Sequence, residues 1–163
     1  MKVAVFSDTH TNTARMVEAV RQTNPDAIIH LGDHERDTLC LKEEFPEIPL
    51  YTVCGNCDFS SNAPAKAVVP LGPVKAFLTH GHLYNVTWST DSLVYAAMEA
   101  GCSIAMFGHT HEPENTEFGG VKVLNPGTAG KGRKLTYAMV EIFDNGGIAC
   151  EIRNLKNAED NSL

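Results

Sequence analysis

The chain has 163 residues, of which 43% are hydrophobic, enough for one compact domain with its own core. Its formal net charge is −7, and it contains no long run of Lys and Arg. Binding to the phosphate backbone depends on clustered cations, so duplex nucleic acid is excluded as an expected partner.

The sequence also bears on location and domain organisation. No apolar stretch approaches the ~20 residues that span a bilayer, so we expect no membrane partner. The N-terminal segment Met1–His10 passes from a short apolar stretch directly into polar residues, which is typical of a first strand and not of a secretion signal. Five cysteines without a regular spacing indicate free thiols and predict a cytoplasmic protein. We expect a single domain over residues 1–156 and a polar tail over residues 157–163.

Short apolar runs recur along the first two-thirds of the chain, and each is followed by a turn that carries Asp, His or Asn. Runs of this length, rich in Val, Ile and Phe and bounded by Gly and polar residues, predict buried strands. They are Lys2–Phe6, Ala27–Leu31, Leu50–Val53, Lys75–Leu78 and Ile104–Phe107.

Segments with helical spacing lie between these strands, at Thr13–Arg21, Asp37–Glu44 and Asp91–Ala100. Asn12 is the expected N-cap of the first helix, and Gly101 the expected end of the third. Strands that alternate with helices imply crossover connections, so we expect a largely parallel sheet here.

The last third of the chain changes character. Val121–Leu124, Lys134–Phe143 and Ile148–Arg153 are strand-like and have no helix between them, and Asn145-Gly146-Gly147 predicts a hairpin turn. We therefore expect a second, mostly antiparallel sheet packed against the first.

All five early strands end in residues of the types that bind metal ions in proteins. Ligands of open α/β sheets bind beyond the carboxyl ends of the strands, so these side chains are expected to meet at one edge of one sheet. Any one motif alone has an ordinary explanation, such as a turn at Gly32-Asp33, but the joint pattern indicates a metal centre. Imidazole, carboxylate and amide groups suit Mn, Fe, Co, Ni or Zn, and this many ligands suit two adjacent metals. The predicted ligands are Asp8, His10, Asp33, Asn56, His80, His109 and His111.

The same residues, in the same order, resemble the calcineurin-like metallophosphoesterase superfamily. The motifs are Asp8-x-His10, Gly32-Asp33, Gly55-Asn56, His80-Gly81-His82 and Gly108-His109-Thr110-His111. Chain length, the Gly-Asn-Cys-Asp sequence and Asn125-Pro126-Gly127-Thr128 are similar to the small YfcE-type phosphodiesterase branch. The resemblance implies an α/β fold, a four-layered α/β/β/α sandwich of two mixed β-sheets flanked by helices. It also implies a homo-oligomer, although the residues themselves leave the oligomeric state open.

Carried over by position, the resemblance implies two divalent metal ions, with manganese first among the candidates above. Asp8, His10, Asp33 and His111 would hold one ion; Asn56, His80 and His109 would hold the other together with Asp33, which bridges both. Two cations about 3.5–4 Å apart can hold a bridging hydroxide and clamp a phosphoryl group for in-line attack. The expected reaction is hydrolysis of a small phosphodiester.

Two residues, Cys57 and His82, are candidates for the group that protonates the leaving alcohol. Much of the superfamily has His after the motif Asn, where this chain has Cys57. A thiol is a poor general acid near neutral pH because its reference pKa is about 8.5. His82 is the candidate replacement, and its alternative role is to orient the pocket. We expect substrates with good leaving groups to be favoured.

Other residues near the motifs have two readings. Glu35 and Asp37 straddle the position of an acid that often follows the bridging Asp, and His34 is expected to cap a helix or face solvent. The basic group Lys131, Arg133 and Lys134 is either a solvated loop or a phosphate-facing rim. Cys54 and Cys57 form an incidental C-x-x-C, and Tyr84 and Trp88 either pack or stack on an aromatic ester.

Two other function classes compete with the enzyme. One is a protein-binding scaffold, the role of this fold in the retromer subunit Vps29, whose metal site is altered. The other is a metal- or nucleotide-binding module without turnover. The intact ligand set favours the enzyme, because a scaffold does not need so many ionisable groups in one crevice.

Overall fold

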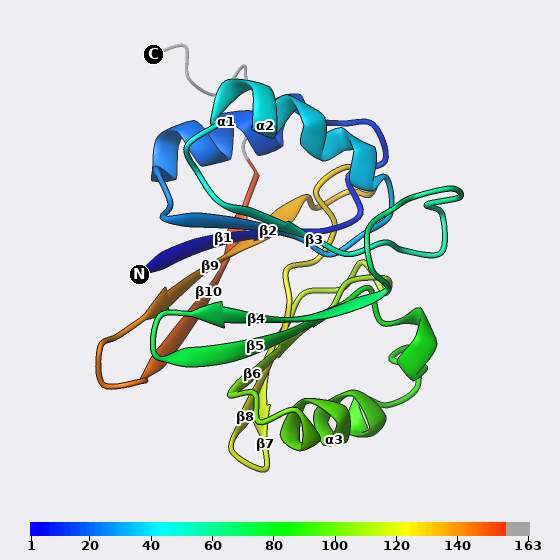
Figure 1. The fold of residues 1–163 in the computed structure, drawn as a ribbon. Coiled ribbons are helices and arrows are strands. Elements are labelled where there is room, and N and C mark those ends of the chain that lie inside the picture. Colours follow the sequence, from blue (N-terminus) through cyan, green and yellow to red (C-terminus); the bar gives the residue numbers. More distant parts are fainter. Residues whose placement is uncertain (156–163) are drawn as a thin grey trace.

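The computed structural model describes residues 1–155, which form two five-stranded mixed sheets lying face to face (Figure 1). The first sheet has the order β10-β9-β1-β2-β3 and comprises β1 (Lys2–Phe6), β2 (Ala27–His30), β3 (Leu50–Thr52), β9 (Thr136–Ile142) and β10 (Ile148–Asn154). The second has the order β4-β5-β6-β8-β7 and comprises β4 (Lys66–Leu71), β5 (Val74–Thr79), β6 (Ile104–Met106), β7 (Glu114–Phe118) and β8 (Val121–Asn125).

Helices cover the outer face of each sheet. The first sheet is covered by α1 (Ala14–Thr23) and α2 (Leu39–Glu44), and the second by α3 (Asp91–Glu99). Two short 3-10 helices, η1 (Glu35–Thr38) and η2 (His82–Tyr84), lie in the loops after β2 and β5. The predicted α/β/β/α sandwich is confirmed, while the predicted tail lies outside the described residues.

The alternation of side chains along β1 explains the layering. Val3 and Val5 face the core between the two sheets, whereas Ala4 and Phe6 face α1 and α2. All four are fully buried, because a central strand of a four-layered fold is covered on both faces. Burying a side chain such as Val or Phe contributes roughly 1.5–3 kcal/mol, so this continuous apolar run can only lie in the middle of a sheet.

The predicted helices are confirmed at their cores and differ at their ends. α3 buries Leu93, Val94 and Ala97 against the second sheet, and Gly101 follows it with a φ of +68°. α1 begins one residue later than predicted, with Thr13 and not Asn12 as its N-cap, and no side chain caps it. A cap predicted from residue type alone is not decisive, because packing of the apolar face also fixes where a helix starts.

The predicted division into one early parallel sheet and one late antiparallel sheet is wrong. β9 pairs antiparallel with β1, and β8 pairs parallel with β6, so the last third contributes strands to both sheets. The hydrophobic pattern identified these strands but could not choose their neighbours. β4 and β7 were missed because both are edge strands: β4 carries Pro70, and β7 is largely exposed.

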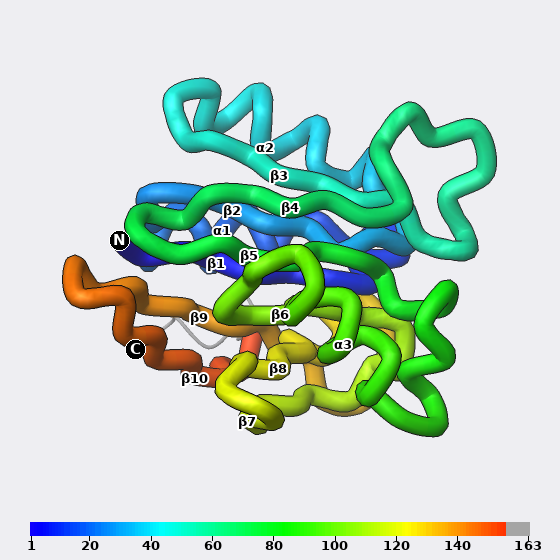
Figure 2. The backbone as a smooth tube through the Cα atoms, turned by 60° about the horizontal axis from the view of Figure 1, so that its bottom comes forward, coloured from blue at the N-terminus to red at the C-terminus, as the bar shows by residue number. Residues whose placement is uncertain are grey.

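The carboxyl ends of β1, β2 and β3 from the first sheet and of β5 and β6 from the second lie on the same side of the molecule (Figure 2). The motif-bearing loops therefore converge from two facing sheets and not, as predicted, at the edge of one. Within residues 1–155, none of the helices has the length and apolar character needed to cross a membrane.

Candidate metal centre

The backbone is in the left-handed region at five of the seven predicted ligands. The φ values are 55° at Asp8, 44° at His10, 56° at Asp33, 69° at His109 and 62° at His111. Non-glycine residues in this region are each strained by roughly 1–3 kcal/mol and persist only where surrounding contacts fix them. Such clustering marks these turns as a functional site.

Hydrogen bonds to two other loops and to the neighbouring Ser7 hold the strained turn at Asp8. The Asp8 N–H donates to the Gly32 carbonyl (3.0 Å), and the Asp8 carbonyl accepts bonds from the Thr128 hydroxyl (3.0 Å) and the Gly130 N–H (3.1 Å). The Ser7 hydroxyl donates to Asp8 Oδ2 (2.5 Å). The carboxylate is thus fixed before any ligand binds.

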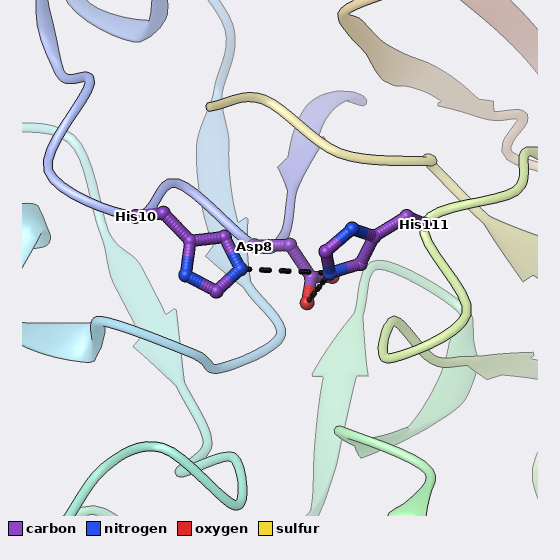
Figure 3. A group of neighbouring side chains, drawn as sticks. All are labelled: Asp8, His10 and His111. Atoms are coloured by element: carbon purple, nitrogen blue, oxygen red, sulfur yellow. Dashed lines mark hydrogen bonds and ion pairs between the residues drawn. The ribbon is translucent and has the colours of Figure 1, made fainter. Parts of the chain in front are cut away.

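The first group of closely spaced ligand atoms comprises Asp8, His10 and His111 (Figure 3). His111 Nε2 lies 3.1 Å from Asp8 Oδ1 and 3.5 Å from His10 Nε2. The ligand atoms of all three lie within 4.8 Å of one another. Ligands bound to one cation at about 2.0–2.2 Å have this separation, so the group fits a transition metal.

The second group comprises Asp8, Asp33 and His80, and all three side chains are buried. His80 Nε2 lies 3.4 Å from Asp33 Oδ1 and 4.0 Å from Asp8 Oδ1, and its Nδ1 donates to the Leu31 carbonyl (2.7 Å). That bond directs Nε2 toward the carboxylates, as in most metal-binding histidines.

Asp8 Oδ1 and His80 Nε2 are both buried without a hydrogen-bond partner. Buried polar atoms are almost always satisfied, and a cation between these two would satisfy both. The residues present therefore fit the metal ions that the sequence predicts.

Burial and charge set the protonation states of the cluster. Burial alone would raise the pKa of Asp8, but His111, His80 and Ser7 together lower it below its usual value. Burial likewise opposes the lowering of the Asp33 pKa, which the nearby His80 ring and the hydrogen bond from the Cys57 N–H bring about. Both acids are anionic at neutral pH, so the centre concentrates buried negative charge that a cation would neutralise.

The histidines divide into two classes. Burial lowers the pKa values of His10 and His109, which favours the neutral, metal-binding imidazole. Burial also opposes protonation of His80, but Asp33 and Asp8 outweigh it and raise the pKa. The pKa of His111 is raised mainly by its contact with Asp8. Metal binding to His80 and His111 would therefore compete with their protonation.

His109 and Asn56 lie next to the two groups. The His109 N–H donates to Asp8 Oδ2 (3.2 Å), and its ring centroid is 5.2 Å from that of His80. The Asn56 loop is joined to Asp33 by a bond from the Cys57 N–H to Asp33 Oδ1 (2.9 Å). Asn56 itself is exposed, and its amide donates to Cys57 Sγ (3.5 Å). Its coordination of a metal stays a prediction.

The two candidate acids differ in environment. Cys57 is exposed, yet desolvation and the nearby Asp33 carboxylate raise the pKa of its thiol to about 11. The His82 ring lies 5.6 Å from the His80 ring and 6.3 Å from the His109 ring. Its Nδ1 is buried without a partner, and burial lowers its pKa, aided by His80 and His109.

The structure shows the contacts of the acidic, histidine and aromatic residues near the motifs for which the sequence allowed two roles. Asp37 accepts a bond from the Thr11 N–H (2.7 Å), and Glu35 accepts one from Ser61 (3.0 Å), so both acids tie loops together. The His34 ring packs against that of His10, with centroids 5.0 Å apart. The Tyr84 ring packs edge-on against Phe77, whereas Trp88 is exposed. All five cysteines are free thiols.

Asp58 is a functional residue that the motif analysis overlooked. Its Oδ2 accepts bonds from the Asp33 N–H (2.9 Å) and the Gly55 N–H (2.7 Å), while Oδ1 accepts one from the Glu35 N–H (2.8 Å). One carboxylate thus joins the loops after β2 and β3. Its place directly after Gly55-Asn56-Cys57 was the available signal, but this position also suits an ordinary turn residue.

His30 was also overlooked, because it lies inside a predicted strand. It is fully buried; its Nε2 is 3.2 Å from the Thr9 hydroxyl, and its Nδ1 accepts a bond from the Gly32 N–H (3.3 Å). His30 therefore contacts two of the loops that carry predicted metal ligands, at Thr9 and at Gly32. Desolvation lowers its pKa to about 4, so it is neutral at physiological pH.

Comparison with known proteins shows the family of the chain. Residues 1–145 match the model of the calcineurin-like phosphoesterase superfamily domain. The probable metallophosphoesterase YsnB of Bacillus subtilis is 30% identical over 131 residues, which cover 78% of this chain and 75% of that protein. Phosphodiesterase MJ0936 of Methanocaldococcus jannaschii is 27% identical over 147 residues, which cover 78% of this chain and 83% of that protein.

The fold is shared with Vps29 of Entamoeba histolytica, whose structure was solved in complex with zinc. The TM-score is 0.75 at 21% identity, covering 96% of this chain and 100% of that one. The fold, the converging ligand loops and the match over residues 1–145 lead to one conclusion: the chain belongs to the calcineurin-like phosphoesterase superfamily.

Proposed function

We propose that this metallophosphoesterase family member is a phosphodiesterase that depends on two divalent metal ions and hydrolyses a small phosphodiester. The observation that carries the proposal is the pair of overlapping ligand groups, Asp8 with His10 and His111, and Asp8 with Asp33 and His80. Asp8, which both groups share, and His80, which belongs to the second, each have a buried atom without a hydrogen-bond partner, Oδ1 and Nε2 respectively. A phosphodiesterase among the relatives supports the choice of substrate class.

The proposed ligand sets extend these two groups by the residues that the family resemblance implies. Asp8, His10, Asp33 and His111 would hold one ion, and Asp33, Asn56, His80 and His109 the other. When bound, such ions activate a water molecule and clamp the phosphoryl oxygens. We propose manganese as the first candidate, with nickel, iron, cobalt and zinc as alternatives, because this ligand set accepts all of them.

The residues themselves limit the protonation of the leaving alcohol. A Cys57 thiol with a pKa of about 11 gives up its proton reluctantly, and His82 is mostly neutral at pH 7 because its pKa is lowered. His82 lies beside His80 and His109 and is the better-placed donor. Esters whose leaving groups need no proton are therefore the favoured substrates.

The test is hydrolysis of bis(4-nitrophenyl) phosphate by metal-stripped protein reloaded with Mn²⁺. We expect turnover in the reloaded wild type and a loss of at least about 100-fold in Asp33→Asn and His109→Ala. Metal content measured on the same samples separates lost binding from lost chemistry. Asp26→Asn, a change distant from the centre, should retain activity.

A protein-binding scaffold is the competing function, because Vps29 has the same fold. Wild-type protein that binds two metals and hydrolyses no phosphodiester would contradict the enzyme and favour the scaffold or a non-hydrolytic binding module. The five free thiols support the proposal of a cytoplasmic protein.

A further inference from the structure

The most exposed large apolar side chains lie on loops that carry predicted ligands. Among residues 1–155, Trp88 is 90% exposed and Phe59 is 85% exposed, whereas the other exposed large hydrophobic side chains, such as Tyr95, reach at most 61%. A ring left in water adds nothing to the stability of the fold. Aromatic side chains exposed near a polar centre take part in binding more often than single apolar side chains scattered over the rest of the surface.

The two rings come from opposite sheets. Phe59 follows Asn56 by three residues in the loop from β3 to β4, and Trp88 follows His82 by six residues in the segment from η2 to α3. Figures 1 and 2 both show these segments projecting beyond the carboxyl ends of the strands, on the same side of the molecule. The two segments therefore flank the candidate metal centre.

The backbone at both rings is fixed although the rings are free. Phe59 directly follows Asp58, whose carboxylate accepts three backbone N–H groups. The Trp88 N–H donates to the Asn85 carbonyl (3.0 Å), and Val86 between them is buried. A side chain presented from a fixed backbone loses little conformational entropy when a ligand binds.

We propose that Phe59 and Trp88 form an aromatic rim that stacks on a planar ring in the organic part of the phosphoester. The ligand class is a nucleoside or aryl phosphoester, with the phosphoryl group at the metal centre and its ring against the rim. The proposal rests on the proposed function, since that function places the phosphoryl group. An uncharged ring is also a suitable partner for the surface of an acidic protein, which repels anions.

Trp88 is the single tryptophan of the chain, so its fluorescence reports directly on this rim without any turnover. The experiment uses full-length protein loaded with Zn²⁺ and two probes that share a sugar phosphate, AMP and ribose 5-phosphate. We expect AMP to change the Trp88 emission saturably and to bind about tenfold more tightly by calorimetry, because stacking on an aromatic side chain contributes about that factor.

Variants assign the effect to the rings. Phe59→Ala and Trp88→Ala should each weaken AMP binding about tenfold and leave ribose 5-phosphate binding unchanged, while Trp88→Phe should retain the preference. Tyr95→Ala, at an exposed ring on α3, is the matched control and should change neither affinity. Both rim side chains are exposed, so these variants should fold like the wild type.

Three results would overturn the rim: equal binding of AMP and ribose 5-phosphate, a preference for AMP that survives both alanine variants, or Trp88 emission that depends on protein concentration without a probe. The last would assign the rings to contact between copies of the chain. The two proposals fail separately. An AMP preference in a protein without hydrolysis retains the rim and rejects the enzyme, whereas hydrolysis without an AMP preference does the reverse.

Discussion

Replacing Asp58 by Asn tests whether one carboxylate sets the geometry of the metal centre. The Asp58 side chain accepts three backbone N–H groups, from Asp33, Gly55 and Glu35. Asn has one acceptor oxygen where Asp has two. If that oxygen stays at the Oδ2 position, the bonds from Asp33 and Gly55 survive, and the new NH₂ group faces the Glu35 N–H.

The cost follows from the bonds lost. A hydrogen bond to a charged group contributes about 1.5–3 kcal/mol, and Asp58 is half-buried, so Asp58→Asn should lower the free energy of unfolding by about 2 kcal/mol. Asp58→Ala removes all three bonds and should cost about 4 kcal/mol, since water replaces part of the loss. Because the loops of Asp33 and Asn56 then separate, metal affinity should fall about 10–100-fold.

Urea unfolding of the metal-free protein measures the first effect, and Zn²⁺ competition against a chelator measures the second. Asp26→Asn is the matched control, because Asp26 accepts the Lys2 N–H (2.6 Å) at the opposite end of the strands. It should change stability without changing metal affinity. An Asp58→Asn protein with wild-type unfolding midpoint and wild-type Zn²⁺ affinity would refute the reasoning.

Three further predictions follow from the same loops. Gly55→Ala should weaken Zn²⁺ binding and cost about 1–3 kcal/mol of stability, because a Cβ there would lie 2.2 Å from Asp33 Oδ1; an unchanged chelator titration would contradict this. For His30, whose pKa falls from 6.5 to about 4 on folding, protonation favours the unfolded chain, so metal-free protein should lose about 3 kcal/mol between pH 6.5 and pH 4. Urea midpoints across this range test it, and His30→Gln should lack that part of the pH dependence. Finally, kcat for an aryl phosphodiester should greatly exceed kcat for a dialkyl phosphodiester when both are measured on protein with the same metal content. Equal rates would show that a strong general acid is present.

The strand ends were predictable because each buried run stops at a polar turn. Lys2–Phe6 was predicted with its observed bounds, and the loops that follow such runs placed Asp8, Asp33 and His80 where the structure brings them together. The sheet to which each strand belongs was not predictable. Apolar alternation shows which strands are buried, but it carries no information about neighbours.

The residues that hold the ligand-bearing loops in place by hydrogen bonds were the hardest to predict from the sequence. Asp58 and Thr128 act through bonds to the backbone of distant loops, and such bonds do not require a particular residue type in the partner. Asp8 and Asp33 could be recognised because metal chemistry restricts the side chain itself. The choice of Asp33 as the bridging ligand, the single-domain boundary and the homo-oligomer stay predictions.

The candidate metal centre also joins the two sheets. Asp8 and Asp33 belong to one sheet and His80 to the other, and His80 Nδ1 already crosses the gap to the Leu31 carbonyl. A cation held by all three would couple its binding free energy to the docking of the sheets. At 100 times its dissociation constant, an ion that binds only the folded chain adds about 2.7 kcal/mol. The supply of metal would then govern how long the folded protein survives as well as how fast it works.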